Sequence, residues 1–222
     1  FMDELVKNHT AIMSRFDPEH RVGLIVDEWG AWYDVEPGTN PGFLYQQNTM
    51  RDAMIAAATL NIFNSHSYRV IMANIAQTIN VLQSVILTEG EKMVLTPTYH
   101  VFDFYKGHQD AALLPSFAEA ESIATEKGDL PNVSISASQK DDGSILLTIA
   151  NFSADKPYEG DCRLEGMQPS AAEGQVLTAA FNAYNDFDSQ PVVPAALKDI
   201  TVDGDMLRFT LPPCSVAAIT VK

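Results

Sequence analysis

Cysteine is scarce in this chain. Only Cys162 and Cys214 occur among its 222 residues. They are well separated, without the close Cys/His spacing of a zinc site, and two cysteines do not make the disulfide framework of a small secreted domain. We expect both to be small buried residues, and a single bridge between them is an alternative that the pattern does not support.

Positive charge is also scarce. The chain has 14 Lys and Arg against 29 Asp and Glu, which gives a net charge of -15. The acidic excess is found in both halves of the sequence. Such a surface repels phosphate backbones and anionic membranes, so we expect neither a nucleic-acid nor a membrane partner. A neutral polysaccharide would be indifferent to it.

A long hydrophobic run is missing as well, and neither a signal peptide nor a transmembrane segment is apparent. The first residues already follow helical apolar spacing, and no capping residue precedes them. We therefore expect the sequence to be cut from a longer protein inside a helix. Localisation cannot be inferred from such a start.

One short run stands out among the residues that are present. The apolar stretch Val22–Val26 ends on Asp27 and Glu28, and Trp29 and Trp32 follow. A continuous apolar stretch is typical of a strand buried on both faces, and the end of such a strand is where α/β folds place their chemistry. Aromatic residues beside a carboxylate are common in sugar-binding clefts. Glu28 is thus a catalytic candidate, and the alternative is an ordinary strand-end acid that caps a turn or forms a salt bridge.

The sequence pattern changes near residue 109. Before it, apolar periodicity predicts alternating helices and strands; after it, short β segments are divided by Gly, Asp, Asn and Pro. The pattern predicts an α/β unit over residues 1–109 and an antiparallel β-sandwich over residues 110–222. The expected helices are 1–16, 43–64 and 98–107, and the expected strands are 21–26, 69–74, 132–138, 144–152, 161–166, 174–181, 206–211 and 215–221.

Several motifs, in order, resemble the later part of the glycoside hydrolase family 51 α-L-arabinofuranosidases. The resemblance is densest from residue 1 to about residue 115 and continues more weakly to about residue 216. It implies the C-terminal part of a (β/α)8 TIM barrel, roughly its last quarter, followed by the β-sandwich. The motifs are Asp27–Tyr33, Pro37–Asn40, Gln46–Asn48, Arg51–Ala53, Asn74–Asn80 and Thr96–Phe102, then Leu177–Thr178, Ala183–Asn185 and Leu211–Val216.

The resemblance also implies a retaining mechanism and three site residues. Glu28 matches the nucleophile, Gln77 matches a glutamine that approaches the sugar hydroxyl beside the anomeric carbon, and Trp32 matches an aromatic residue of the cleft wall. The alternatives are a strand-end amide that binds loop backbone for Gln77 and core packing for Trp32. A retaining enzyme needs a second carboxyl group about 5 Å from the nucleophile.

In this family the second group, the acid/base glutamate, follows an asparagine at the end of an earlier barrel strand. The chain contains no matching Asn-Glu pair. We therefore expect the chain to need an upstream barrel half, and alone to be a poor catalyst. The intact enzyme would release terminal non-reducing α-L-arabinofuranosyl residues from arabinan- or arabinoxylan-type oligo- and polysaccharides, without a cofactor or a metal.

The remaining polar candidates have simpler interpretations. Asp27 is expected to position its loop, because adjacent strand residues point to opposite faces, and Trp29 is expected to pack. No metal-ligand spacing connects the histidines. We expect all five to lie on the solvent or helix surface: His9, His20, His66, His100 and His108.

Two other kinds of function remain open. The chain could be a non-catalytic partner or scaffold that pairs through an open barrel edge, because strands with unpaired backbone groups invite association. A homo-oligomer that covers these edges belongs to this hypothesis. The other is one half of a split glycosidase, in which a second polypeptide supplies the missing acid.

Overall fold

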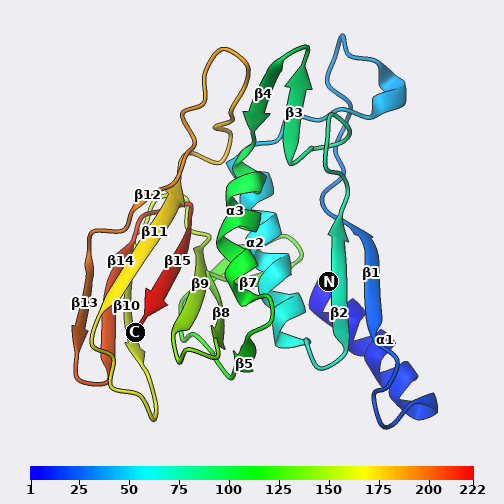
Figure 1. The fold of residues 1–222 in the computed structure, drawn as a ribbon. Coiled ribbons are helices and arrows are strands. Elements are labelled where there is room, and N and C mark those ends of the chain that lie inside the picture. The colour runs from blue at the N-terminus through cyan, green and yellow to red at the C-terminus, as the bar shows by residue number, and fades with distance from the viewer.

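The computed structural model describes residues 1–222, and Figure 1 shows their arrangement in layers. A three-stranded sheet, a six-stranded sheet, the helices α2 and α3, and a pair of parallel strands follow one another across the molecule. The helices are α1 Met2–Phe16, α2 Met50–Ser65 and α3 Pro97–Tyr105, with short 3-10 helices η1 Pro41–Phe43 and η2 Lys106–His108. The strands are β1 Leu24–Trp29, β2 Val70–Ile75, β3 Ile86–Glu89, β4 Lys92–Leu95, β5 Ala112–Leu114, β6 Ser122–Thr125, β7 Gly128–Pro131, β8 Val133–Gln139, β9 Ile145–Asn151, β10 Tyr158–Arg163, β11 Ala172–Thr178, β12 Ala195–Ala196, β13 Ile200–Asp203, β14 Met206–Leu211 and β15 Ser215–Val221.

The helices of the first part are close to those expected, with one difference at the start of α2. The prediction that this helix begins at Phe43 was wrong, because it begins at Met50. A capping box fixes this start: the Thr49 side chain and backbone bind Asp52, and both residues are buried. Phe43 instead ends the 3-10 helix η1.

Strands β1 and β2 pair in parallel and form a sheet of their own. Leu24 and Val26 pack against the buried apolar cluster to which helices α2 and α3 contribute. The expectation that this strand is covered on both faces was wrong, because Ile25 is 43% exposed and Ile71 of β2 is 67% exposed. No further strand or helix of the chain lies over that face (Figure 1).

The β1–β2 register is irregular at the catalytic candidate. Val26 lies opposite Ala73 and Trp29 lies opposite Ile75, so three steps along β1 match two along β2. Val26 and Trp29 both pack against the core, and the two carboxylate residues between them, Asp27 and Glu28, are both exposed. The irregularity interrupts the alternation on which the expected placement of Asp27 and Glu28 on opposite faces depended, so that placement stays a prediction.

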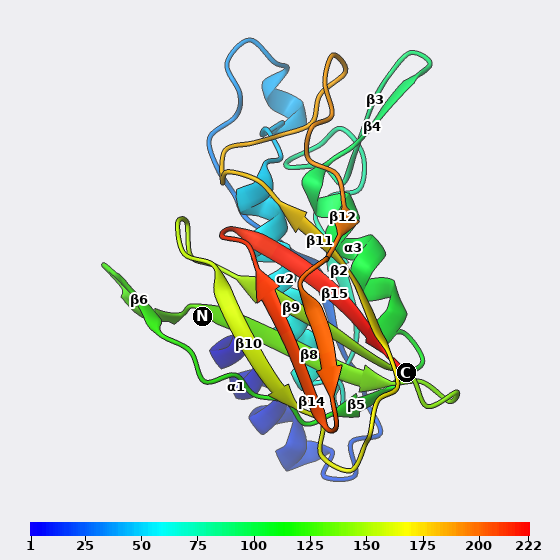
Figure 2. The same cartoon turned by 90° about the vertical axis from the view of Figure 1, so that its left-hand side faces the viewer.

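The second part consists of antiparallel sheets. One has the order β12-β11-β15-β9-β8-β5 and the other the order β10-β14-β13. Ile149 and Ile219 of the first sheet share a buried cluster with Leu207 and Phe209 of the second, and Figure 2 shows the smaller sheet in front of the larger one. Hairpins β3–β4 and β6–β7 stand apart from both sheets.

Helices α2 and α3 pack on the other face of the six-stranded sheet. Met50 and Val101 of the helices share one apolar cluster with Ala150 and Val216 of the sheet. The proposed boundary near residue 109 stays a prediction, and apolar packing is continuous across it.

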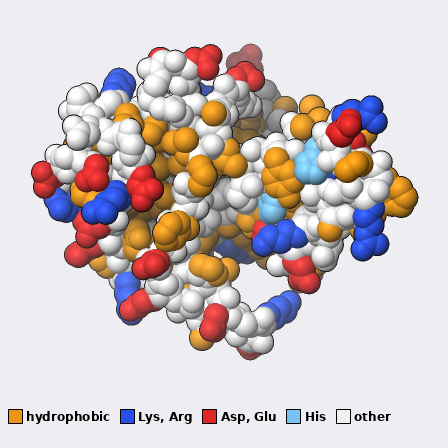
Figure 3. Space-filling model, turned by 90° about the horizontal axis from the view of Figure 1, so that it is seen from below, with side chains coloured by type: hydrophobic (Ala, Val, Ile, Leu, Met, Phe, Trp, Pro, Cys, Tyr) orange, Lys and Arg blue, Asp and Glu red, His pale blue; other side chains and the backbone are white.

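No helix is both long and apolar enough to cross a membrane. Acidic side chains are spread across both sides of the face seen in Figure 3.

Three of the five histidines are not where the sequence predicted them. His66 and His100 are 7% and 8% exposed, and His108 is largely enclosed between α3 and the sheet. They lie at helix ends or on helix faces that the second part of the chain or α1 covers, which helical spacing alone did not reveal. His9 and His20 are exposed, as expected.

Both cysteines are free thiols, so the alternative of a bridge between them is excluded. Cys214 is buried, as expected, and burial raises its pKa to about 12. Cys162 is only partly buried.

Candidate functional site

Glu28 is exposed near the end of β1, as is Asp27, at the point where the register with β2 is irregular. The next residue anchors the strand end. Trp29 is 5% exposed and packs edge-on against Phe63 and parallel to Phe102, with ring centroids 5.4 Å and 6.1 Å away. Its predicted packing role is confirmed. A β irregularity that re-aims a side chain beside a rigid aromatic anchor is a common device near active sites.

Gly30 allows the loop after β1 to pass close to the loop after β2. Its φ is +144°, and a Cβ there would lie 2.7 Å from Gln83 Nε2. The Ala76 N–H donates to the Trp29 carbonyl at 2.9 Å, which holds the two strand ends together. Gln77 follows directly, so Glu28 and Gln77 come from adjacent ends of paired strands.

Gln77 has a fixed backbone and an exposed side chain. Its carbonyl accepts from the Val85 N–H at 3.2 Å. Farther along the same loop, the Asn80 side chain accepts from the Thr88 N–H at 2.8 Å and donates to the Thr88 carbonyl at 3.1 Å, which ties the loop to hairpin β3–β4.

Trp32 is 66% exposed, so the alternative that it packs in the core is excluded. The following residue is held firmly. The Tyr33 N–H donates to Gln46 Oε1 at 2.7 Å, and the Arg51 guanidinium lies 3.6 Å from the centre of the Tyr33 ring. Burial raises the pKa of the Tyr33 hydroxyl. A cation over the face of an aromatic ring adds to this anchorage.

Buried amide side chains support the loops that follow β1 and β2. The sequence did not single them out as site residues. Asn48 Nδ2 donates to the Gln83 carbonyl at 2.9 Å and to Thr98 Oγ1 at 2.8 Å. Gln46, Asn48 and Gln83 are 1%, 1% and 2% exposed. A polar run before a helix is indistinguishable from an ordinary loop until tertiary structure encloses it. The only signal was that Gln46 and Asn48 belong to a motif shared with a known family.

The arrangement thus presents two neighbouring exposed carboxylates, one exposed amide and one exposed indole at or just after the ends of two paired strands. These groups can bind a neutral polyhydroxylated ring and attack it. No group of three or more His, Cys, Asp and Glu residues in the chain could hold a metal ion.

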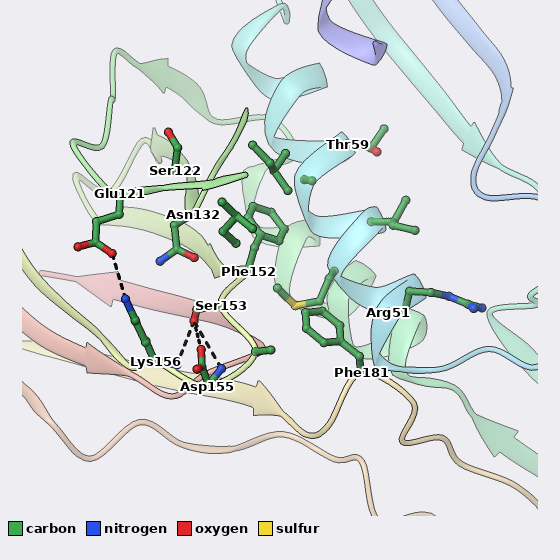
Figure 4. Close-up of a pocket in the computed structure, with 16 residues that line it drawn as sticks. Arg51, Thr59, Glu121, Ser122, Asn132, Phe152, Ser153, Asp155, Lys156 and Phe181 are labelled. Atoms are coloured by element: carbon green, nitrogen blue, oxygen red, sulfur yellow. Dashed lines mark hydrogen bonds and ion pairs between the residues drawn. The ribbon is translucent and has the colours of Figure 1, made fainter. Parts of the chain in front are cut away.

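A separate pocket of about 710 Å³ lies between α2 and hairpin β6–β7 (Figure 4). Its walls are mainly apolar, with Met54, Phe152 and Phe181 among them. Several of its polar groups bind one another: Lys156 Nζ lies 3.4 Å from Glu121 Oε2, and Ser153 Oγ donates to Asp155 Oδ1 at 3.1 Å. None of the sequence-predicted site residues lines it, so this pocket is separate from the candidate site at the strand ends.

Comparison with known proteins agrees with the motifs. A sequence profile of the α-L-arabinofuranosidase C-terminal domain matches residues 27–215. The chain belongs to the family 51 α-L-arabinofuranosidases. It corresponds to the C-terminal region of these glycosidases.

Individual relatives of this arabinofuranosidase region also match the chain over only part of their own length. An intracellular exo-α-L-arabinofuranosidase from Bacteroides ovatus is 40% identical over 224 residues, which cover 100% of this chain and 44% of that protein. The crystal structure of the family 51 arabinofuranosidase from Xanthomonas axonopodis pv. citri matches 100% of this chain and 45% of its own at 45% identity, with a TM-score of 0.96. The Thermotoga maritima α-L-arabinofuranosidase, solved as an arabinose complex, shares the fold at 23% identity and a TM-score of 0.79, over 99% of this chain and 46% of its own. The chain thus spans less than half the length of these relatives.

Proposed function

We propose that this chain carries the nucleophile of a retaining exo-α-L-arabinofuranosidase, with Glu28 in that role. Gln77 binds the hydroxyl beside the anomeric carbon, and Trp32 forms a wall of the cleft. The substrate is a terminal α-L-arabinofuranosyl residue of an arabinan- or arabinoxylan-type saccharide. The observation that carries the proposal is the exposure of Glu28 at the irregularity in β1, beside the end of the strand that leads into Gln77.

In this mechanism Glu28 attacks the anomeric carbon and the glycosidic oxygen leaves with a proton from a second carboxylic acid. Water then hydrolyses the glycosyl ester, and the second group acts as the base. We assign that second group to an upstream barrel half, because the chain has no Asn-Glu pair. Loss of a general acid alone costs about 100-fold to 10,000-fold in rate.

The proposal also assigns each part of the chain to a fold. The strand pair with its helices is the last quarter of a (β/α)8 barrel, and the two antiparallel sheets form the β-sandwich. The exposed apolar face of β1 and β2 supports this assignment: Ile25, Ile71 and Met72 are 43%, 67% and 52% exposed. Further barrel strands would pair with these edges and bury these side chains.

The test is hydrolysis of 4-nitrophenyl α-L-arabinofuranoside by this chain, alone and together with the polypeptide that supplies the preceding barrel strands. We expect activity only from the combination. Glu28→Ala should abolish it, and added azide should restore turnover with β-arabinofuranosyl azide as product, because the small anion enters the space of the missing carboxylate. Asp27→Asn is the matched control, since it removes the neighbouring exposed carboxylate, and azide should not rescue it. Activity that survives Glu28→Ala would refute the assignment.

A second candidate is a non-catalytic partner or scaffold, which the open edges of β1 and β2 favour. The split glycosidase is a separate alternative, in which this chain carries the nucleophile and a second polypeptide brings the acid. Solution mass separates the cases. A discrete homo-oligomer without activity would indicate that copies cover each other's strand edges, whereas a stoichiometric complex with a barrel fragment and restored hydrolysis would support the catalytic proposal.

A further inference from the structure

One buried residue connects the loop that carries Trp32 with the loop that carries Gln77. Gln46 is 1% exposed, and it lies between the segments that follow β1 and β2. Its backbone N–H donates to the Leu82 carbonyl at 2.9 Å, its Nε2 donates to the Leu44 carbonyl at 3.3 Å, and its Oε1 accepts from the Tyr33 N–H at 2.7 Å. Three pieces of backbone, at Tyr33, Leu44 and Leu82, therefore bind one residue: the first two bind its side chain, and Leu82 binds its backbone N–H.

Two of these pieces have an unfavourable backbone conformation. Leu44 has a φ of +53° and Leu82 a φ of +54°, in the left-handed region that branched apolar residues rarely adopt. Such conformations persist only where the surrounding structure enforces them, and they concentrate at functional sites. Both leucine carbonyls bind Gln46, but only the bond to Leu44 comes from its side chain. The bond to Leu82 comes from the backbone N–H, which any residue except proline would keep.

The third piece leads to the candidate sugar site. Tyr33 is fixed through its N–H by Gln46 and through its ring by the Arg51 guanidinium. Trp32 precedes it and is 66% exposed, with no core packing to determine its position. Its place in the cleft therefore depends on the backbone of Tyr33.

We propose that Gln46 is a positioning residue that sets the place of Trp32 against the sugar through the Tyr33 N–H. This inference rests on the proposed function. Gln46 itself does not reach the substrate, because its side-chain atoms are enclosed by the two loops.

A first test needs no activity and uses this chain as it is. Trp29→Phe leaves Trp32 as the sole tryptophan, and time-resolved fluorescence anisotropy then reports the local motion of Trp32. Adding Gln46→Met, which keeps the length of the side chain but offers no oxygen, should increase the fast component of the decay. Gln46→Glu, at a pH low enough to keep its carboxyl protonated, keeps an oxygen for the Tyr33 N–H and a donor for the Leu44 carbonyl, and should restore the slow decay. Unchanged anisotropy in a folded Gln46→Met protein would overturn the proposal.

A second test uses the assembled, active enzyme. Gln46→Met should raise KM about tenfold, the equivalent of one lost hydrogen bond, and should change kcat much less. In a Trp32→Ala background the same substitution should have almost no further effect on KM. Asn151→Ala is the matched control: it removes an equally buried amide in the β part, so it should lower stability while leaving KM unchanged.

The outcomes separate this inference from the function on which it rests. If Trp32→Ala raises KM but Gln46→Met does not, the positioning role is wrong and the subsite stands. Additive KM effects of the two substitutions would also overturn it, since they would show that Gln46 does not act through Trp32. If Trp32→Ala leaves KM unchanged in an active enzyme, the subsite assignment fails, and the anisotropy result alone then decides whether Gln46 orders Trp32.

Discussion

Arg69 Nη1 donates to Asp17 Oδ2 at 2.7 Å, and the Arg69 side chain is completely enclosed. The same guanidinium donates to the Val22 carbonyl at 2.8 Å and to Ser14 Oγ at 3.2 Å. One residue at the entry to β2 thus holds the end of α1, the turn after it and the approach to β1. The catalytic candidate is at the far end of that strand.

The first prediction concerns this pair. Arg69→Met should lower the free energy of unfolding by about 3 kcal/mol, because it removes a buried charge on which several groups depend. Lys7→Met is the matched control: Lys7 pairs with Asp3 on the exposed face of α1, where ion pairs contribute little, so no measurable loss is expected. Urea denaturation followed by circular dichroism measures both. Equal effects of the two substitutions would contradict this account.

The second prediction is the acid response of Asp17. The backbone N–H of Val22, and then the Arg69 guanidinium, hold the pKa of this carboxyl at about 2. A lowered pKa in the folded state means that the unfolded chain binds more protons in acid, so stability is full above pH 4 and falls as the pH drops toward 2. Urea midpoints between pH 2 and pH 5 test this. Asp17→Asn should flatten the decline, and an unchanged slope would exclude Asp17 as its source.

A buried polar network joins the helices to the six-stranded sheet. His108 Nδ1 lies 2.7 Å from Ser138 Oγ, and His108 Nε2 lies 2.9 Å from Thr148 Oγ1. Thr148 donates onward to Asn61 Oδ1 at 3.0 Å, and the Tyr105 hydroxyl donates to the same oxygen at 2.7 Å. Because Thr148 donates to Asn61, it accepts from Nε2–H. The Ser138 hydroxyl can then donate to Nδ1, an arrangement that fits a neutral imidazole.

The third prediction follows from that neutrality. Burial lowers the pKa of His108 to about 4, with a smaller contribution from Lys140. Between pH 6.5 and pH 4 the unfolded chain binds a proton that the folded chain does not, so stability falls as the pH drops through this window, by roughly 3 kcal/mol. His108→Gln should remove this part of the pH dependence, while His9→Gln, at an exposed position of α1, should keep it. The rate of hydrogen exchange at the Thr148 amide, followed over the same pH window, gives an independent measure of this loss of stability.

Sequence periodicity identified the longer elements of this fold. Helix α1 and the strands β8, β9, β14 and β15 lie within a residue or so of the predicted ranges. Their apolar positions repeat over several turns or pairs, and packing follows that repeat. Hairpin β6–β7 was missed because its residues are mostly exposed and carry no alternation. The early start given to α2 came from apolar residues near Phe43, which imitate a helical stripe.

The candidate site was predicted in part. A resemblance of motifs pointed to Glu28, Gln77 and Trp32, and the structure places all three at exposed positions near two strand ends. Their catalytic and binding roles stay predictions. The register irregularity in β1 could not be foreseen, because it depends on the pairing partner β2. The support from Gln46 depends on contacts between distant loops, which no local pattern encodes.

The last prediction concerns Gly30. Its φ of +144° lies in a region that is essentially restricted to glycine, and an added Cβ would meet Gln83 Nε2 at 2.7 Å. Gly30→Ala should therefore displace the buried Gln83 and separate the two loops, with a loss in unfolding free energy of more than about 2 kcal/mol and a reduced kcat/KM in the assembled enzyme. Gly143→Ala is the matched control: its φ is +84°, but nothing lies within 4 Å of the added carbon, so only backbone strain of about 1 kcal/mol is expected. Because Gly143 is in a distant hairpin turn, its substitution should leave kcat/KM unchanged. Equal losses in both variants would mean that the close approach of the two loops at Gly30 adds nothing beyond the strained φ.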